Sequence, residues 1–238
     1  MPLSGVMEEN MQAETNILSK LDFLGLNDLM DNDVAIFQNA KKFVEMQQLY
    51  NAAIKELYTK LEILNEEFQV KYDYNPIHHI ETRLKSAKSI LDKLEKRDLP
   101  LSFESIQENI FDIAGIRVIC NYIDDIYKIE DFLSRQDDVK IIRVRDYIKD
   151  PKENGYRSLH LILQIKIYLY DRIELMPVEI QIRTIAMDFW ASLEHHLKYK
   201  AKNEVPQYLR DRLTNCSEVI TNLDEEMQLI HKEINKFY

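Results

Sequence analysis

The middle of the chain alternates between short apolar strands and amphipathic helices, and this order constrains the fold more than any other feature. It predicts strand 115–122, helix 124–135, strand 139–148, a polar loop at 149–157, strand 158–170, strand 177–184 and helix 185–201. A further helix is predicted near 78–97. Helices interspersed among strands are typical of a sheet covered by helices. We therefore predict a mixed α/β core with helical extensions.

A long amphipathic helix is predicted on each side of this core. Apolar residues recur three or four apart, without Pro or Gly, at Phe43, Met46, Tyr50, Ile54, Leu57, Leu61, Leu64 and Phe68. After Pro206 a second stripe comprises Leu209, Leu213, Cys216, Ile220, Leu223, Met227, Ile230 and Ile234. Each stripe has to be buried, either on the central core or in a helical oligomer interface, and the pattern alone leaves both open.

Three zones follow from these patterns. Residues 1–77 form an acidic N-terminal segment and the first long helix, 78–201 form the core, and 202–238 form the C-terminal helix. Within the first zone, residues 1–37 are less periodic and are predicted to be partly disordered, with a short helix around 17–26.

Composition narrows the class of protein. The chain has 238 residues, 45% of them hydrophobic, which is enough to bury a sizeable core, and only two cysteines. It lacks an apolar run of membrane-spanning length and begins with an acidic rather than a basic segment, so we expect a cytoplasmic protein without membrane partners. The net charge of −10 argues against DNA as a partner, whereas local clusters of Lys and Arg suit small polyphosphates.

Two carboxylates stand beside predicted strands. Asp112 directly precedes strand 115–122, where it is either a capping residue or a ligand of Mg²⁺, which prefers oxygen ligands. In strand 177–184 the alternation places Glu179, Gln181 and Arg183 on one face, which is either solvated or functional. If the two strands are neighbours, Asp112 and Glu179 form the paired carboxylates that phosphoryl or pyrophosphoryl transfer requires.

Cations and an aromatic ring surround these carboxylates in sequence. Lys85, Ser89 and Lys93 are four residues apart and form one stripe of the helix predicted near 78–97, either as phosphate ligands or as ordinary surface residues. In the loop at 149–157, Tyr156 offers a flat surface on which a base can stack, unless it is a buried turn residue. Arg117, within an apolar strand, needs either a salt-bridge partner or a stacked base.

Taken in order, the patterns RxKxxxSxxxK (83–93), DIAGIR (112–117), KxNGYRSxH (152–160) and EIQIRT (179–184) resemble the synthetase domain of the RelA/SpoT homologue family, specifically the small alarmone synthetases. The resemblance covers about residues 78–200. It implies a nucleotidyltransferase-like fold with a mixed five-stranded sheet. It also implies transfer of the β,γ-pyrophosphate of ATP to the 3′-hydroxyl of GDP or GTP, with release of AMP, by a homotetramer built through terminal helices.

The resemblance also assigns roles to residues. Arg83 and Arg117 would sandwich adenine, and Lys85, Ser89 and Lys93 would contact the phosphates of ATP. Asp112 and Glu179 would hold Mg²⁺, and Glu179 would act as, or position, the base. Tyr156 would stack on guanine. The remaining residues implied around the acceptor are Arg143, Arg145, Lys152, Asn154, Arg157, His160, Gln181, Glu194 and His195. Asp188 would reach the guanine edge or support Glu179.

Two other functions stay open. One is a catalytically silent guanine-nucleotide-binding regulatory module, which the presence of both Asp112 and Glu179 disfavours. The other is a nucleotidyltransferase that releases pyrophosphate instead of AMP. The chain lacks the His-Asp hydrolase half of the long family members, so alarmone hydrolysis is not expected.

Overall fold

The computed structural model describes residues 33–200 and 205–237. Residues 1–32 of the segment predicted to be partly disordered (1–37), and the short helix predicted around 17–26, lie outside the described residues, whereas residues 33–37 form the beginning of helix α2 (Asp33–Lys71). In chain order the elements are α2 (Asp33–Lys71), β1 (Ile77–Leu84), α3 (Ala87–Glu95), α4 (Phe103–Asn109), β2 (Ala114–Cys120), α5 (Ile123–Ser134), β3 (Val139–Asp146), β4 (Leu159–Tyr168), β5 (Ile173–Thr184), α6 (Ile185–Lys200) and α7 (Gln207–Ile234).

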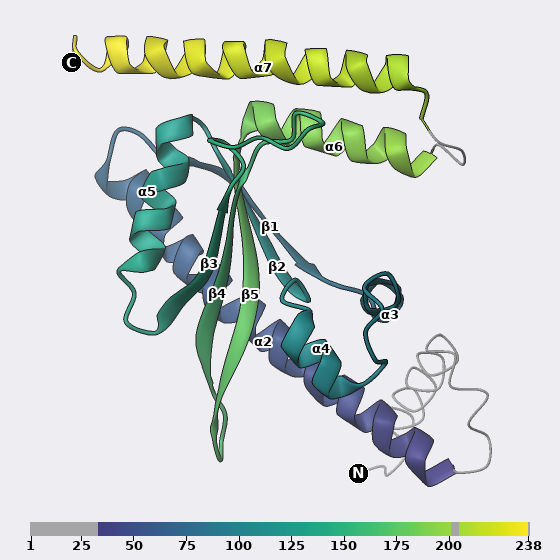
Figure 1. Ribbon diagram of the computed structural model, residues 1–238. Coiled ribbons are helices and arrows are strands. Elements are labelled where there is room, and N and C mark those ends of the chain that lie inside the picture. The colour runs from purple at the N-terminus through teal and green to yellow at the C-terminus, as the bar shows by residue number, and fades with distance from the viewer. Residues whose placement is uncertain (1–32, 201–204, 238) are drawn as a thin grey trace, which may run out of the picture.

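The five strands form one mixed sheet in the order β1-β2-β5-β4-β3 (Figure 1). β2 and β5 are parallel neighbours, whereas the other three pairs are antiparallel. The mixed α/β fold with a five-stranded sheet is therefore confirmed. Because β2 and β5 come from distant parts of the chain, their pairing brings the motifs at 112–117 and 179–184 side by side.

One face of the sheet is buried. Leu159, Leu161 and Leu163 of β4 are fully buried, and Val178, Ile180 and Ile182 of β5 lie on the same face. α2, which runs obliquely across the sheet in Figure 1, and α5 complete this hydrophobic core. Apart from the buried Arg183, the alternate residues of both strands are half-buried or exposed, so the second face of the sheet is available to a site.

The helix predicted near 78–97 is wrong over its first half, which forms strand β1. Ile77, Ile80 and Leu84 are three and four residues apart, the spacing of a helix, because a β-bulge at His78 interrupts the alternation of this edge strand. The helix that follows, α3, begins only at Ala87 and is capped by Ser86, whose hydroxyl accepts from the amide of Ser89.

Two further differences concern the ends of elements. The short helix α4, which no pattern predicted, is capped by the hydroxyl of Ser102. β5 begins at Ile173, so Pro177 lies within the strand rather than before it. β2 pairs with β5 only from Glu179 onward, so the proline nitrogen, which has no proton to donate, lies beyond the end of that ladder.

The long C-terminal helix α7 lies across one end of the sheet, above α5 and α6 (Figure 1). Its buried residues are polar, namely Ser217, Asp224 and Gln228, whereas Leu223 is 58% exposed. None of the helices within the described residues is long and apolar enough to cross a membrane.

Candidate active site

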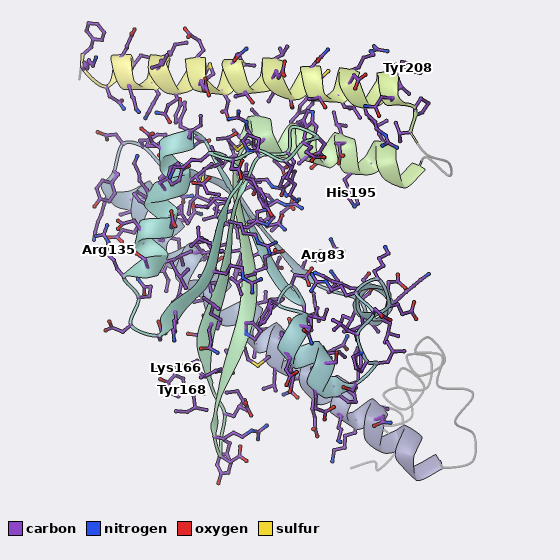
Figure 2. The ribbon with its side chains drawn as sticks, in the orientation of Figure 1. Arg83, Arg135, Lys166, Tyr168, His195 and Tyr208 are labelled. Carbon is purple, nitrogen blue, oxygen red and sulfur yellow. The ribbon has the colours of Figure 1, made fainter. Side chains whose placement is uncertain are left out.

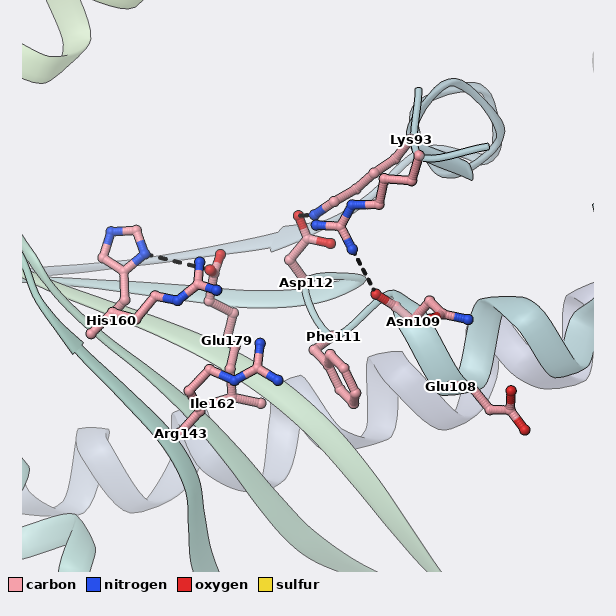
Figure 3. A pocket seen from close by; sticks show the side chains of 11 residues that line it. Lys93, Glu108, Asn109, Phe111, Asp112, Arg143, His160, Ile162 and Glu179 are labelled. Carbon is pink, nitrogen blue, oxygen red and sulfur yellow. Dashed lines mark hydrogen bonds and ion pairs between the residues drawn. The ribbon is translucent and has the colours of Figure 1, made fainter. Parts of the chain in front are cut away.

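Asp112 and Glu179 lie close together on the open face of the sheet. Asp112 immediately precedes β2, and Glu179 in β5 is directly opposite Gly115 of β2 in the parallel register. Both carboxylates line the pocket shown in Figure 3. The condition that the two strands be neighbours is thus met by the fold.

Asp112 is held by two lysines from different elements. Its Oδ2 atom accepts from Lys85 Nζ at 2.8 Å and from Lys93 Nζ at 2.6 Å. Burial alone would raise the pKa of Asp112, but these hydrogen bonds outweigh it and hold the pKa below its usual value. Lys85 precedes α3 instead of lying on it, so the predicted helical stripe is wrong, yet Lys85 and Lys93 still meet at one carboxylate.

Glu179 is enclosed by neighbours from its own strand and from β4. Gln181 Nε2 donates to Glu179 Oε2 at 2.9 Å, and His160 Nδ1 lies 3.5 Å from Glu179 Oε1. Burial raises the pKa of Glu179, but the hydrogen bonds from His160 and Gln181 more than compensate and lower it. Burial lowers the pKa of His160 more than Glu179 raises it, so the pair consists of a carboxylate and a neutral imidazole.

A directed chain of hydrogen bonds leads from Arg183 to Glu179. Arg183 Nη2 donates to the Tyr156 hydroxyl at 2.5 Å, and this hydroxyl lies 2.8 Å from His160 Nε2. Because a guanidinium can only donate, the hydroxyl of Tyr156 is free to donate to Nε2, which leaves the imidazole proton on Nδ1 facing Glu179. The same Arg183 nitrogen also donates to Gln181 Oε1 at 2.7 Å.

The two carboxylates separate two cavities. A cavity of 440 Å³ along β1, β2 and β5 is lined by Arg83, Lys85 and Arg117, and by Gln181. A second cavity of 380 Å³ is lined by Lys93, Arg143, Arg145 and His160 (Figure 3). Asp112 and Glu179 line both. Most predicted ATP ligands thus lie in the first cavity and several predicted acceptor ligands in the second. There are two exceptions: Gln181, a predicted acceptor ligand, lines the first cavity, and Lys93, a predicted ATP ligand, lines the second.

The loop after β3 carries the predicted guanine-binding residues. Asn154 Nδ2 donates to Glu194 Oε1 of α6 at 3.1 Å, which connects two predicted acceptor ligands. Lys152 Nζ lies 4.6 Å from the ring centroids of both Tyr147 and Tyr156. Arg157 donates to the carbonyl of Ile148 at 3.4 Å. Lys152 is exposed, whereas Asn154, Tyr156 and Arg157 are half-buried.

In the first cavity, Arg117 is paired with carboxylates. Its Nη1 atom lies 3.1 Å from Glu81 Oε2 and 3.6 Å from Asp188 Oδ1, while its buried Nε atom has no hydrogen-bond partner. Arg83 is exposed on β1 (Figure 2). Ser89 is half-buried, and its hydroxyl lies 2.9 Å from that of Ser86, so it takes part in the cap of α3.

Two residues have roles that the sequence did not predict. Arg183 is 5% exposed, bonded to Tyr156 and Gln181, and paired with Asp188 at 3.2 Å. Asp188 therefore pairs directly with Arg183 and Arg117, and it is connected to Glu179 only indirectly, because Arg183 donates to Gln181 and Gln181 donates to Glu179. The strand alternation, which placed Arg183 on the same face as Glu179, was the sequence signal that could have indicated a role for Arg183 in the site. His195 is exposed on α6 and does not line either of the two cavities around the carboxylates (Figure 2).

The carboxylates suit a hard divalent cation. Asp112 Oδ1 is buried without a hydrogen-bond partner, although Oδ2 has two. Within residues 33–200 and 205–237, His, Cys, Asp and Glu do not form a cluster of three or more that could hold a metal ion by protein ligands alone. Two carboxylates with substrate phosphates and water completing the shell are the usual arrangement for Mg²⁺.

This fold and site define a class of nucleotide-dependent synthetases, and comparison with known proteins defines the family. The family model described as "Region found in RelA / SpoT proteins" matches residues 82–204. The chain belongs to the RelA/SpoT family, as a small alarmone synthetase.

The chain matches individual relatives over nearly their whole length. GTP pyrophosphokinase YwaC of Bacillus subtilis is 46% identical over 187 residues, which are 79% of this chain and 89% of the relative. GTP pyrophosphokinase YjbM of the same organism is 38% identical over 188 residues, 79% and 87% of the two chains. The structure of small alarmone synthetase 1 from Bacillus subtilis bound to its product pppGpp matches with a TM-score of 0.76 at 36% identity, covering 82% of this chain and 98% of that one.

Proposed function

We propose that this protein transfers the β,γ-pyrophosphate of ATP to the 3′-hydroxyl of GDP or GTP, which yields ppGpp or pppGpp and AMP for stringent-response signalling. The observation that carries this proposal is the pair of carboxylates on the boundary between two cation-lined cavities. Pyrophosphate transfer brings the 3′-hydroxyl of one nucleotide in line with the β-phosphorus of ATP, opposite the AMP leaving group, so a site with one cation-lined cavity for each nucleotide suits it.

For the donor, Arg83 and Arg117 flank the first cavity and would hold adenine between their guanidinium groups. Lys85 and Lys93, which now neutralise Asp112, would turn to the phosphates of ATP, with Ser89 beside them. Arg117 would then exchange its contacts with Glu81 and Asp188 for the base.

For the acceptor, Tyr156 would stack on guanine, with Asn154 and Glu194 nearby. The further acceptor residues are Arg143, Arg145, Lys152, Arg157, His160, Gln181 and His195. Glu179 is ionised and lies between the cavities, so it is placed to accept, or to orient the group that accepts, the proton of the 3′-hydroxyl as the oxygen attacks the β-phosphorus. His160 and Gln181 hold the Glu179 carboxylate in place.

Asp112 and Glu179 would hold Mg²⁺, and the unpartnered oxygen of Asp112 supports this assignment. When bound, the ion would neutralise charge on the phosphates during transfer.

We further propose a homotetramer built through terminal helices, supported by the exposed apolar side chains of α7. The apolar stripe of α2 does not take part in such an interface, because it is buried on the sheet. We place the protein in the cytoplasm because Cys120 and Cys216 are both free, as expected for a reducing compartment.

Glu179→Gln tests the function. This change keeps the size of the side chain and removes its charge. We expect kcat to fall by about 10²–10⁴-fold with nucleotide Kd values changed less than about threefold. Purified protein is incubated with Mg²⁺, ATP and GDP, products are resolved by anion-exchange chromatography, and binding is measured by calorimetry. Glu174→Gln, in the same strand but outside both cavities, is the control.

The products separate the alternatives. AMP and a guanosine carrying two extra phosphates, formed only when both nucleotides are present, support the proposal. Pyrophosphate would indicate a nucleotidyltransferase, and nucleotide binding without any product would indicate a silent regulatory module. Equal loss of binding and turnover in Glu179→Gln would contradict the role of Glu179.

A further inference from the structure

The buried residues of α7 are polar, whereas a helix that packs on a hydrophobic core usually buries apolar residues. Ser217, Asp224 and Gln228 are 6%, 5% and 6% exposed, whereas Val219 and Leu223 on the same helix are 67% and 58% exposed. Burying a carboxylate is costly unless it gains specific partners. The contacts of α7 with the core are therefore specific ones.

Asp224 contacts the junction of β5 and α6. The Thr184 hydroxyl donates to Asp224 Oδ2 at 2.6 Å and accepts from the amide of Met187 at 3.1 Å. Thr184 therefore caps the start of α6, and Asp224 orients its hydroxyl. Thr184 ends the strand that carries Glu179 and Gln181, so this contact fixes the end of that strand.

α7 also supports the loop that carries Tyr156. Gly155 has φ = +84°, and a Cβ atom there would lie 1.8 Å from Ser217 Oγ, so the loop can contact α7 only because residue 155 is glycine. Burial raises the pKa of Asp224, and the hydrogen bond from Thr184 and the charge of Arg157, the next cation along the loop, only partly oppose this rise.

The far half of α7 is anchored independently of this loop. Gln228 Oε1 accepts from the amide of Asp124 at 2.8 Å, and Lys232 pairs with Asp124 at 2.7 Å. His231 stacks on Tyr122 with ring centroids 4.0 Å apart. Because α7 is held at α5, it provides a fixed surface against which the loop and the α6 junction rest.

From these contacts we propose that α7 positions the acceptor-binding loop, with Asp224 as a positioning residue that orients Thr184, the neighbour of Arg183, whose guanidinium donates to Tyr156 of that loop. This inference rests on the proposed function in one respect, namely that the loop at 154–157 binds the acceptor nucleotide. Asp224 itself does not line the two cavities around the carboxylates.

Asp224→Ala tests the proposal through its selectivity between the two substrates. It removes the hydrogen bond and the charge, but leaves the Thr184 hydroxyl to cap α6. We expect the KM for GDP to rise about tenfold, the effect of losing one hydrogen bond to a charged group, while the KM for ATP changes less than about twofold. Asp224→Asn, which can still accept from Thr184, should raise the KM for GDP less.

Companion variants separate positioning from folding. Thr184→Val removes the cap as well and should raise both KM values, whereas Thr184→Ser should restore wild-type behaviour. Ser217→Val adds bulk against Gly155 and should raise the KM for GDP alone. This variant tests the loop contact even if Asp224→Ala does not fold. Glu226→Gln, an exposed charge change on the same helix, is the control and should change neither KM.

Calorimetry with GDP and with a non-hydrolysable ATP analogue repeats the comparison without turnover. If the wild type forms no product, the proposed function fails, and selective loss of GDP binding in Asp224→Ala would still support the positioning role. Unchanged KM values and Kd values in Asp224→Ala and Ser217→Val, or equal weakening of both nucleotides in these variants, would overturn it.

Discussion

The helices α2 and α7 have similar apolar stripes in sequence, but the stripe of α2 faces the core and most of the stripe of α7 faces away from it. Along α2, Tyr50, Leu57 and Leu61 are at most 1% exposed and belong to the main core. Along α7, Leu223 and Ile234 are at least half exposed, and the polar Asp224 is buried instead. Periodicity therefore shows that a helix has two faces, but it does not show which face meets its own domain.

The difference arises from what each helix packs against. α2 covers the apolar face of the sheet, where the residues of β4 and β5 are leucine, isoleucine and valine. α7 lies over the end of the sheet, where Thr184 and the amide of Asp124 offer polar partners. An apolar stripe would leave these groups without hydrogen bonds, which costs more than exposing the stripe.

The largest expected effect is on stability. Leu61→Ala removes a fully buried side chain from α2 and should lower the free energy of unfolding by about 2–5 kcal/mol. Leu223→Ala on α7, where the side chain is 58% exposed, should change it by less than about 0.5 kcal/mol. Urea unfolding at low protein concentration measures both. Equal losses would mean that the stripe of α7 is also buried within its own chain.

The second effect is a pH dependence that the buried face of α2 contributes and α7 does not. Burial raises the pKa of Tyr50 from 10.0 to about 12. Because the folded protein holds this proton more tightly than the unfolded chain, stability is lost as the pH rises from about 10 to about 12. Tyr50→Phe lacks this proton, so relative to wild type it should lose about 2–3 kcal/mol less over that range. Chemical unfolding at pH 10 and pH 12 tests this. Parallel loss in both proteins would show that Tyr50 is not the group responsible.

The smallest expected effect concerns assembly. Leu223→Asp places a charge in the exposed stripe of α7 and should weaken self-association by about tenfold or more, as expected when one apolar contact is replaced by a buried charge. The same change at Ile63 of α2, which is 60% exposed, is the matched control and should leave assembly unchanged. Light scattering coupled to gel filtration across a dilution series reports both. Identical profiles for Leu223→Asp and wild type would exclude this face as an interface.

Much of the site could be predicted because its motifs are local. The alternation in 177–184 correctly placed Glu179 and Gln181 on the face opposite Ile180, and the apolar strand after Asp112 proved to be the neighbour of β5. Lys85 and Lys93 were correctly grouped, although for the wrong reason. They meet at Asp112 through a strand-to-helix turn instead of along one helix.

Other parts could not be predicted because their signals are not local. β1 is an edge strand with a bulge, so its apolar residues imitate helical spacing. Asp188 and Arg183 are five residues apart, and their common partners, Arg117 and Tyr156, come from β2 and from the loop after β3. Only packing shows that these four side chains form one network.

The sequence by itself determined the mixed α/β class, the two candidate carboxylates and the family, because each depends on residue types at short, regular spacing, whereas the pairing of the two carboxylates came from the neighbouring strands β2 and β5. The tertiary structure alone decided which stripe is buried, which cations neutralise Asp112, and how α7 contacts the loop at Gly155. The physical reason is that a short segment specifies its own two faces, whereas the partner of each face depends on which surfaces remain unpaired after the rest of the chain has packed.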